Sequence, residues 1–394
     1  MGRGGMTEAI RELGERERLD WLRLFRSRGV GPQTFAQLLA RFGSAADALD
    51  GAAEAARKAG RKGLVIADAD LVAKEAARAG RLGVRYVASC EPGYPAALRA
   101  IPDPPPVIGV RGDPSLLRRD GVAIVGARNA SAAGRRIAAD LARDLGASSL
   151  VVVSGLARGI DGAAHEAALD AGTVAVVAGG LDTVYPPEHD QLMAAIIERG
   201  AVVSEVALGV TARARDFPKR NRIVSGLSLG IVVVEAAERS GTLITARMGA
   251  EQGREVFAVP GSPLDPRSAG TNALIRSGAV LVRHADDVTE ALRPLTVRAA
   301  ETGPGWGAAS RAADAEARAD LAGQLHTLLG YTPVHIDALC REVGRTHAHV
   351  ADALLDLVLS GRAAEMSGGF YVRGADEDAL DSGAGTGERR SSMY

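Results

Sequence analysis

The chain has 394 residues, of which 46% are hydrophobic and 24% charged, and its net charge at pH 7 is −1. This length predicts two to four domains with buried cores, and the neutral balance excludes a molecule that is basic all over, so any phosphate-binding surface must be local. The two cysteines, Cys90 and Cys340, match no metal-ligand spacing. We therefore expect no disulfide, metal site or cofactor, no signal peptide or membrane span, and a cytoplasmic setting.

Residues 1–85 are predicted to form a helical domain. Apolar side chains recur at helical spacing on both sides of Gly29-Val30-Gly31-Pro32. Glycine ends a helix, and proline suits the first turn of the next one. The pattern is typical of a helix-hairpin-helix (SAM-like) unit, whose turn amides can hold a DNA phosphate. A plain turn in a helical bundle is the alternative.

A proline-rich stretch over 102–106 is predicted to be an extended linker or edge segment. Within a domain spanning 86–295, short β-branched runs then alternate with helices of crossover length. The runs are apolar at nearly every position, as expected of parallel strands buried on both faces. We predict a doubly wound, Rossmann-like α/β fold with a mainly parallel sheet. The predicted strands are Val122–Val125, Leu150–Val153, Val174–Val177, Ala201–Val203, Ile231–Val234, Val256–Val259 and Ala279–Val282.

The C-terminal part is predicted to carry a winged helix over residues 318–375. Three helices, Leu321–Leu329, Ile336–Val343 and Thr346–Leu359, precede two short strands, Ala363–Met366 and Phe370–Arg373. A flexible linker is expected before it, over 296–317, because that stretch lacks apolar periodicity. A disordered tail is expected after it, over 376–394.

The loops that follow the strands are the candidate site, because ligands of open α/β sheets bind outside the carboxyl ends of the strands. Small residues there let a ligand approach the backbone, and helix N-termini attract anions. Simple chain reversal is the alternative for any single loop. The loops are Gly126–Ser131, Ser154–Asp161, Gly179–Asp182, Glu235–Thr242 and Pro260–Ser262.

Two patterns in the sequence resemble enzyme motifs, but neither meets the requirements of its motif. Gly126 and Gly134 do not complete the dinucleotide fingerprint, so a nicotinamide cofactor is not expected. The stretch Gly226–Gly230 matches G-x-S-x-G, but a helix is predicted before it and a strand after it. A nucleophile elbow needs the reverse order, so we interpret this match as a decoy.

The segment Arg213–Arg222 is the most basic part of the chain, with five positive charges and one negative charge in ten residues. Phe217 lies within it and is followed by Pro218. Cations that track phosphates, together with an aromatic ring on which a base can stack, are typical of single-stranded nucleic-acid binding. A solvated loop whose phenylalanine packs into the core is the alternative.

Taken in order, these segments resemble the DNA-processing protein A family (DprA, also called Smf) in its three-domain form. The stretches that carry the resemblance are AIVGARNAS (123–131), SGLARGIDGAAHEAAL (154–169), GGLDTVYP (179–186), SEVALG (204–209), FPKRNRIVSGLS (217–228), VVVEAAERSGTLITARMGAEQGREVFAVPG (232–261) and GTNALIRSGAVLV (270–282).

The resemblance implies a protein that binds and protects single-stranded DNA, helps load the RecA recombinase in natural transformation and recombination, and forms a homodimer through its α/β domain. It implies no catalysis. The expected DNA-binding residues are Gly126, Ala127, Arg128, Ser154, Gly155, Phe217, Lys219, Arg220, Arg222, Ser240, Gly241 and Thr242. The expected supporting residues are Asp161, His165, Asn221 and Glu235.

Several roles stay open from the residues alone. Arg220 or Arg222 could instead pair with Asp161 or Glu235 and hold the site together. Asp161 is predicted to cap the helix that carries His165. His165 is more typical of a packed, hydrogen-bonded residue than of a catalytic base, since no nucleophile or metal cluster accompanies it.

Two other functions are alternatives. A nucleotide-binding or phosphoribohydrolase-like enzyme would use the same fold, but the loop Glu238–Thr242 lacks the Pro-Gly-Gly of such enzymes. Alternatively, the winged helix could bind duplex DNA or a protein, although Asp352 and Asp356 make its third helix less basic than a major-groove reader needs.

Overall fold

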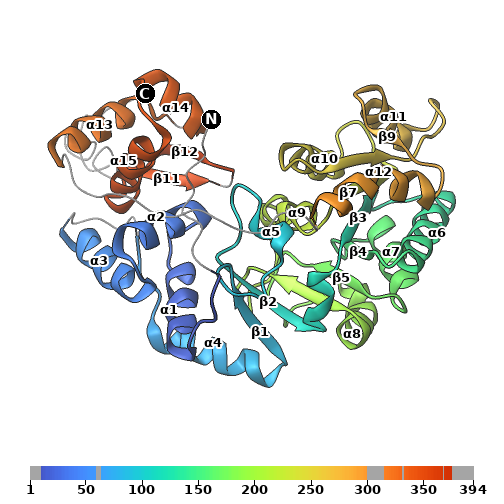
Figure 1. Cartoon of the computed structure of the whole chain (residues 1–394), viewed down its shortest axis with the longest axis horizontal. Helices are drawn as coiled ribbons and strands as arrows, with labels where there is room; N and C mark the ends of the chain where they lie inside the picture. The colour runs from blue at the N-terminus through green and yellow to red at the C-terminus, as the bar shows by residue number, and fades with distance from the viewer. Residues whose placement is uncertain (1–9, 59–63, 300–314, 331, 367, 375–394) are drawn as a thin grey trace, which may run out of the picture. The chain divides into compact units, whose positions relative to one another are not determined.

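The computed structural model describes residues 10–58, 64–299, 315–330, 332–366 and 368–374 (Figure 1). The chain forms two compact units. The first comprises Met1–Arg26 and Asp68–Ser310, and the second comprises Ser27–Ala67 and Arg311–Tyr394. The helical segment predicted over 1–85 therefore contributes to both units. Within the described ranges, no helix is long and apolar enough to cross a membrane.

The first unit is built on a nine-stranded sheet in the order β1-β2-β6-β5-β4-β3-β7-β8-β9. The seven strands from β6 to β9 in this order run parallel, which confirms the predicted doubly wound fold. The strands are β1 (Val84–Ala88), β2 (Val107–Gly112), β3 (Gly121–Gly126), β4 (Val151–Ser154), β5 (Thr173–Val176), β6 (Ala201–Ser204), β7 (Gly230–Val234), β8 (Glu255–Ala258) and β9 (Val280–Leu281).

Helices cover both faces of this sheet. Successive side chains of a strand point to opposite faces, and because both sets are apolar here, each face packs against helices. Val122 and Ile124 of β3 pack in one core with α6 and α12, whereas Ala123 and Val125 pack in the other with α9 and α10. The α-helices of this unit are α1 (Glu15–Arg26), α4 (Ala69–Arg81), α5 (Ala96–Arg99), α6 (Ala132–Ala147), α7 (Ile160–Ala168), α8 (Asp190–Arg199), α9 (Asp216–Gly226), α10 (Thr242–Glu251), α11 (Ala269–Arg276) and α12 (Ala285–Ala299). Short 3₁₀ helices are η1 (Pro114–Arg118), η2 (Pro187–His189) and η3 (Pro266–Ser268).

The antiparallel edge formed by β1 and β2 was not predicted from the sequence. β2 follows the proline-rich stretch directly and contains Gly109, so its sequence lacks the long β-branched run of the central strands. The proline-rich stretch is itself packed, since the Tyr94 hydroxyl donates to the Pro105 carbonyl at 2.8 Å. It therefore leads into the sheet and is not a free linker.

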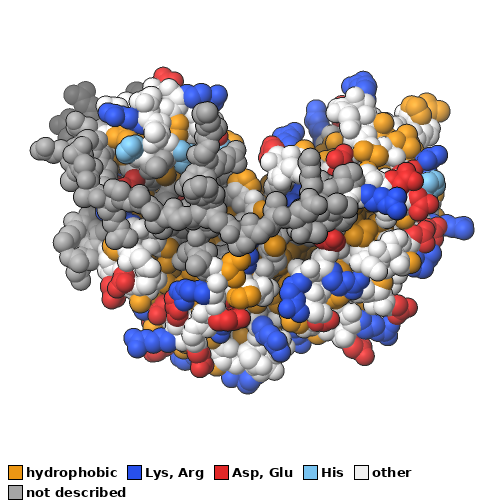
Figure 2. Space-filling view, viewed as in Figure 1, with side chains coloured by type: hydrophobic (Ala, Val, Ile, Leu, Met, Phe, Trp, Pro, Cys, Tyr) orange, Lys and Arg blue, Asp and Glu red, His pale blue; other side chains and the backbone are white. Residues whose placement is uncertain are grey.

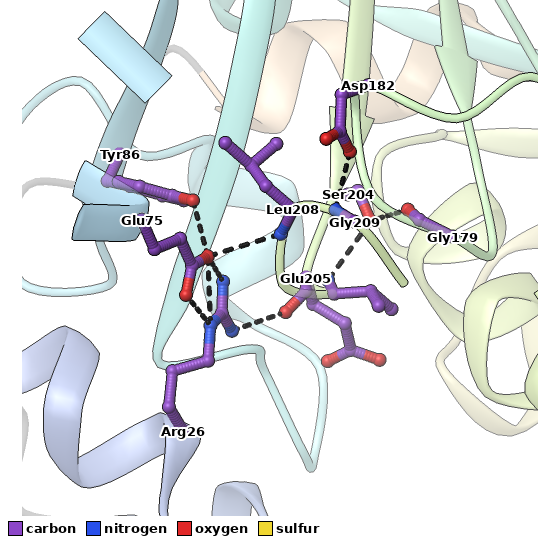
Figure 3. A network of polar contacts seen from close by, with 10 residues as sticks. Arg26, Glu75, Tyr86, Gly179, Asp182, Ser204, Glu205, Leu208 and Gly209 are labelled. Atoms are coloured by element: carbon purple, nitrogen blue, oxygen red, sulfur yellow. Dashed lines mark hydrogen bonds and ion pairs between the residues drawn. The ribbon is translucent and has the colours of Figure 1, made fainter. Parts of the chain in front are cut away.

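A partly buried polar network joins α1, α4 and β1 to the loop after β6 (Figure 3). The Arg26 guanidinium pairs with the Glu75 carboxylate at 3.0 Å and donates to the Glu205 carbonyl at 2.9 Å. Glu75 also accepts from the Tyr86 hydroxyl at 2.6 Å and from the Leu208 amide at 3.3 Å. Burial, with the neighbouring Glu75 charge, raises the pKa of Tyr86. The network fixes the start of the loop that leads into α9.

The second unit contains a winged helix, as predicted. Its elements are α2 (Pro32–Phe42), α3 (Ala45–Lys58), α13 (Ala315–Leu328), β10 (Val334–His335), α14 (Ile336–Val343), α15 (His347–Leu359), β11 (Ala363–Met366) and β12 (Phe370–Arg373). The three strands form one sheet in the order β10-β12-β11. Leu325, Leu339, Leu354 and Tyr371 are buried together in its core.

The linker predicted over 296–317 was too long at both ends. Helix α12 continues to Ala299 and α13 already begins at Ala315. Residues 315–317 are alanine and glutamate, which favour a helix even without apolar periodicity. Residues 296–299 include the β-branched Thr296 and Val297, so helix propensity does not explain that end. The rest of that segment, 300–314, and the predicted tail, 376–394, lie outside the described residues.

Candidate nucleic-acid interface

The carboxyl edge of the sheet has its topological switch point between β3 and β7, which are neighbours although β4 follows β3 in the chain. The loops after β3 and β7 meet there. The Glu235 carboxylate accepts from the Ser131 amide at 2.9 Å and from the Ser131 hydroxyl. The Thr242 hydroxyl donates to the Gly126 carbonyl at 3.0 Å. These bonds join the two loops across the switch point.

Glu235 also restricts which ligands the N-terminus of α6 can bind. A Cβ on Gly134 would overlap the Glu235 carboxyl group, so this carboxylate lies directly against the first turn of α6. Dinucleotide-binding folds hold a phosphate at the equivalent helix terminus. Here a carboxylate of the same charge sign occupies that position, which disfavours a nucleotide phosphate there.

A cationic and aromatic cluster lies at the same edge, formed by Arg128, Tyr185 and Phe217, which we call the aromatic platform. The Arg128 guanidinium carbon is 5.1 Å from the centroid of the Phe217 ring. The Tyr185 and Phe217 ring centroids are 5.5 Å apart, with the rings tilted by 51°. Arg128 is exposed, Tyr185 is 47% exposed and Phe217 is half-buried. The platform thus presents a cation and two aromatic rings to solvent.

Three separate segments of the chain, two loops and the start of a helix, build the platform. Arg128 follows β3, Tyr185 follows β5, and Phe217 lies in the first turn of α9 after β6. The parallel sheet brings them together because the carboxyl ends of its strands share one edge. Lys219 lies on the same helix as Phe217, and its side chain is exposed.

The basic segment is divided by its helix into exposed and buried cations. Arg220 is only 6% exposed, and its Nη1 donates to the Val176 carbonyl at 2.7 Å. Burial lowers the pKa of Arg220 to about 10, against the favourable charge of Asp161, and the Arg128 charge lowers it further. Arg220 therefore lies in the interior, within electrostatic range of Asp161 and Arg128.

Arg222 is also buried, at 5% exposure. It forms ion pairs with Asp103, at 3.5 Å, and with Glu205. Both carboxylates raise the pKa of Arg222 against the opposing effect of burial. The pairing considered from sequence, with Asp161 or Glu235, is wrong for Arg222, because the fold brings Asp103 from the proline-rich stretch next to α9.

The prediction that Asp161 caps its helix is wrong. Gly159 is the N-cap residue of α7, and Asp161 lies in the first turn. The Asp161 carboxylate accepts from the amides of Gly155 at 3.1 Å and Ala157 at 3.3 Å. Burial raises the pKa of this carboxyl, although Arg220 and these amides oppose the rise. Asp161 thus holds the loop after β4 in place from within.

His165 is a packed, neutral residue. Its Nδ1 lies 2.8 Å from the Thr173 hydroxyl, which itself donates to the Val152 carbonyl at 2.7 Å. Because the hydroxyl proton is used there, Nδ1 must be the donor, which places the ring proton on Nδ1. Burial is the main cause that lowers the pKa of His165 to about 3.

The remaining predicted residues are distributed between surface and interior. Ser154 is fully buried, and its hydroxyl donates to the Ile124 carbonyl at 2.6 Å. Gly241 is exposed at the start of α10, where the Ser240 hydroxyl accepts from the Thr242 amide at 3.2 Å. Also at this edge, Gly126 and Gly155 are buried, whereas Ala127 and Asn221 are half-buried.

The G-x-S-x-G match is a decoy, as its context predicted. Helix α9 precedes it and β7 follows it. The Ser228 hydroxyl is fully buried and donates to the Val224 carbonyl at 2.9 Å. Among the residues that the structure describes, no three His, Cys, Asp or Glu side chains gather where they could hold a metal.

Sequence reasoning missed three residues of this region. Tyr185 stands in the GGLDTVYP stretch, so its place in a loop after a predicted strand was an available signal. Asp103 and Glu205 gave no signal, because each is an isolated acid that becomes a partner of Arg222 only through the fold.

The fold and this edge define a Rossmann-like α/β protein with a cationic, aromatic surface and an added winged helix. Family models match the chain in three parts: DNA recombination-mediator protein A over residues 85–293, a DprA-like N-terminal HHH domain over 15–78, and a DprA winged helix domain over 309–369. The chain belongs to the DNA recombination-mediator protein A family.

Named relatives agree with this assignment. Protein Smf of Escherichia coli is 40% identical over 288 residues, which cover 71% of this chain and 75% of that protein. The solved structure of DNA processing protein A from Streptococcus pneumoniae is 33% identical with a TM-score of 0.58, over 71% of this chain and 98% of that one. The solved structure of DNA processing protein A from Helicobacter pylori, which concerns that protein's single-stranded DNA binding mode, is 28% identical with a TM-score of 0.50. The match covers 54% of this chain and 96% of that one.

Proposed function

We propose that this chain binds single-stranded DNA at the carboxyl edge of its Rossmann-like sheet and is not an enzyme. The observation that carries the proposal is the aromatic platform, in which the exposed Arg128 guanidinium lies over the Phe217 ring with Tyr185 beside it. A base can stack on an aromatic face without regard to its identity, and a guanidinium can pair with the adjacent phosphate. The Helicobacter pylori relative, described as binding single-stranded DNA, supports the same reading.

The set of residues proposed to contact DNA is smaller than the set expected from the sequence. Arg128, Phe217 and Lys219 keep their place as DNA-binding residues, and Tyr185 joins them. Among the small residues of the edge, Ala127, Ser240, Gly241 and Thr242 supply backbone that a strand can approach closely. Gly126, Ser154 and Gly155 are buried, so we assign them a structural role in the loops. Arg220 and Arg222 are assigned a supporting role, because each guanidinium is buried and bonded inside the protein.

A binding titration tests this site. Wild type, Arg128→Ala and Arg136→Ala are titrated against a fluorescent poly-dT oligonucleotide and an equivalent duplex, at two salt concentrations. Arg136 is the matched control, because it is an exposed arginine of α6 that loses the same charge. We expect the wild type to prefer the single strand and Arg128→Ala to weaken binding about tenfold. The logarithmic salt slope should fall by about 0.7, the value for one phosphate contact on a single strand.

The outcome separates a specific site from general charge. If Arg128→Ala and Arg136→Ala lose affinity equally, binding is a property of overall charge and the platform is not the site. If the wild type shows no preference for the single strand, the winged helix becomes the better candidate.

Family membership also supports a role beyond binding. We propose that the chain protects single-stranded DNA and helps load the RecA recombinase onto it in natural transformation and recombination. Nuclease digestion of a bound oligonucleotide tests protection. RecA assembly on that oligonucleotide, with and without the chain, tests loading. Protection without faster RecA assembly would reject the loading role alone.

A homodimer through the Rossmann-like unit is a further part of the proposal. Apolar side chains gather over the end of this unit where α11 and β9 lie (Figure 2). Leu264, in the loop between β8 and η3, is 93% exposed, and Leu281 of the edge strand β9 is 41% exposed. Burying such side chains in a partner would remove apolar surface from water. Sedimentation of wild type against Leu281→Asp tests this, with a shift to monomer expected.

A nucleotide-processing enzyme is the weaker candidate. The Glu235 carboxylate occupies the first turn of α6, so a nucleotide phosphate would meet a like charge at the switch point. Release of free base from a nucleoside monophosphate would overturn this assignment.

A further inference from the structure

The glycine turn before α2 has left-handed backbone at Gly29 (φ 87°) and begins the helix without a side-chain cap of its own. Pro32 occupies the first turn and has no N–H to offer. The amides that follow would need an acceptor from elsewhere, since helix N-termini leave their first N–H groups without intrahelical partners. This is the turn whose amides, in a helix-hairpin-helix unit, would face a DNA phosphate.

A carboxylate from the winged helix fills that position within the second unit. Glu365 of β11 accepts from the Thr34 amide at 2.9 Å and from the Thr34 hydroxyl. A Cβ on Gly31 would lie 3.3 Å from Glu365 Oε1, so the carboxylate stands directly over the glycine turn. A charged acceptor on these donors resembles a bound phosphate in both charge sign and hydrogen-bonding geometry.

Neighbouring contacts hold the same two segments together. The Tyr371 hydroxyl of β12 donates to the Gln33 side chain at 3.2 Å. Arg41, at the other end of α2, pairs with Asp356 of α15 at 2.7 Å. Burial, together with the nearby Glu365 side chain, raises the pKa of Tyr371.

We propose that this is an autoinhibitory contact: Glu365 acts as an internal substitute for a DNA phosphate and keeps the glycine turn closed to nucleic acid. The turn becomes available to a phosphodiester backbone only when strands β11 and β12 move away from α2. The ion pair between Arg41 and Asp356 is partly exposed, so it adds a weaker, salt-sensitive contribution to the closed state. The proposal is independent of the aromatic platform, because it concerns the other unit.

The test uses the full chain carrying Arg128→Ala, so that the platform contributes little to the signal. A fluorescent duplex is titrated against this chain alone, with Glu365→Gln, and with Glu342→Gln. Glu342 is the matched control, because it is an exposed glutamate of α14 and the substitution removes the same charge. We expect Glu365→Gln to raise duplex affinity at least fivefold over the control and to steepen the salt dependence.

Equal affinities for Glu365→Gln and Glu342→Gln would overturn the proposal. If Glu365→Gln fails to unfold cooperatively, Asp356→Asn decides, since it removes the companion ion pair without touching the turn. A gain in affinity for Asp356→Asn beyond that of Glu342→Gln supports the autoinhibitory contact, and no gain rejects it. Loss of the aromatic platform is measured separately, as weak poly-dT binding by the chain whose only substitution is Arg128→Ala.

Discussion

Replacing Arg222 with methionine separates a structural cation from a DNA contact within one short helix. The Arg222 side chain is 6% exposed, and those of its partners Asp103 and Glu205 are 8% and 14% exposed. Methionine keeps most of the length but removes the charge and the donors, so two largely buried carboxylates lose their guanidinium. Removing one member of a buried ion pair costs about 3–5 kcal/mol. Because Glu205 keeps some contact with water, we expect a loss near the lower end, about 3 kcal/mol.

Urea unfolding followed by circular dichroism measures this loss. With an m-value of about 3 kcal/mol per molar, the midpoint should fall by about 1 M. Poly-dT affinity under native conditions should stay within about twofold of wild type, since Arg222 does not reach the surface.

Lys219→Met is the matched control, because Lys219 is exposed on the same helix and loses the same charge. It should change stability by no more than about 0.5 kcal/mol while weakening DNA binding. The reasoning is refuted if Arg222→Met unfolds like wild type but binds DNA poorly, because the guanidinium would then act at the surface.

Three further predictions follow from single contacts. His165 has a folded pKa of about 3, below its unfolded value, so the unfolded chain takes up a proton first as pH falls. Stability should drop by about 1.4 kcal/mol per pH unit from this group between roughly pH 6.5 and 3, and urea titrations of His165→Gln should lack this component. Tyr185→Leu should weaken poly-dT binding by about 1–3 kcal/mol, as read by fluorescence titration, with an unchanged unfolding midpoint because the ring is 47% exposed. Gly155→Ala would place a Cβ on the Arg220 guanidinium and should lower the free energy of unfolding by about 1–3 kcal/mol, whereas an unchanged urea midpoint would contradict the tight packing there.

The sequence by itself determined the central strands and the winged helix. Runs such as Ile231–Val234 are short, β-branched and apolar at every position, and they alternate with helices of crossover length, which is typical of parallel strands buried on both faces. It also determined that the loops after these strands share one edge, because parallel strands all point the same way. Arg128 could be placed at that edge from the sequence alone, whereas Phe217 was connected with Arg128 only through the resemblance to the DprA family.

Only the tertiary structure decided which cations face water. Within α9, Lys219 and Arg220 are adjacent in sequence, yet one is exposed and the other is 6% exposed. Composition marks both as basic, but a turn of 100° per residue sends them to different sides of the helix. The acids that hold Arg222 come from distant segments, as Glu365 does for the glycine turn. Such partners follow from packing between elements, and a one-dimensional pattern does not contain that information.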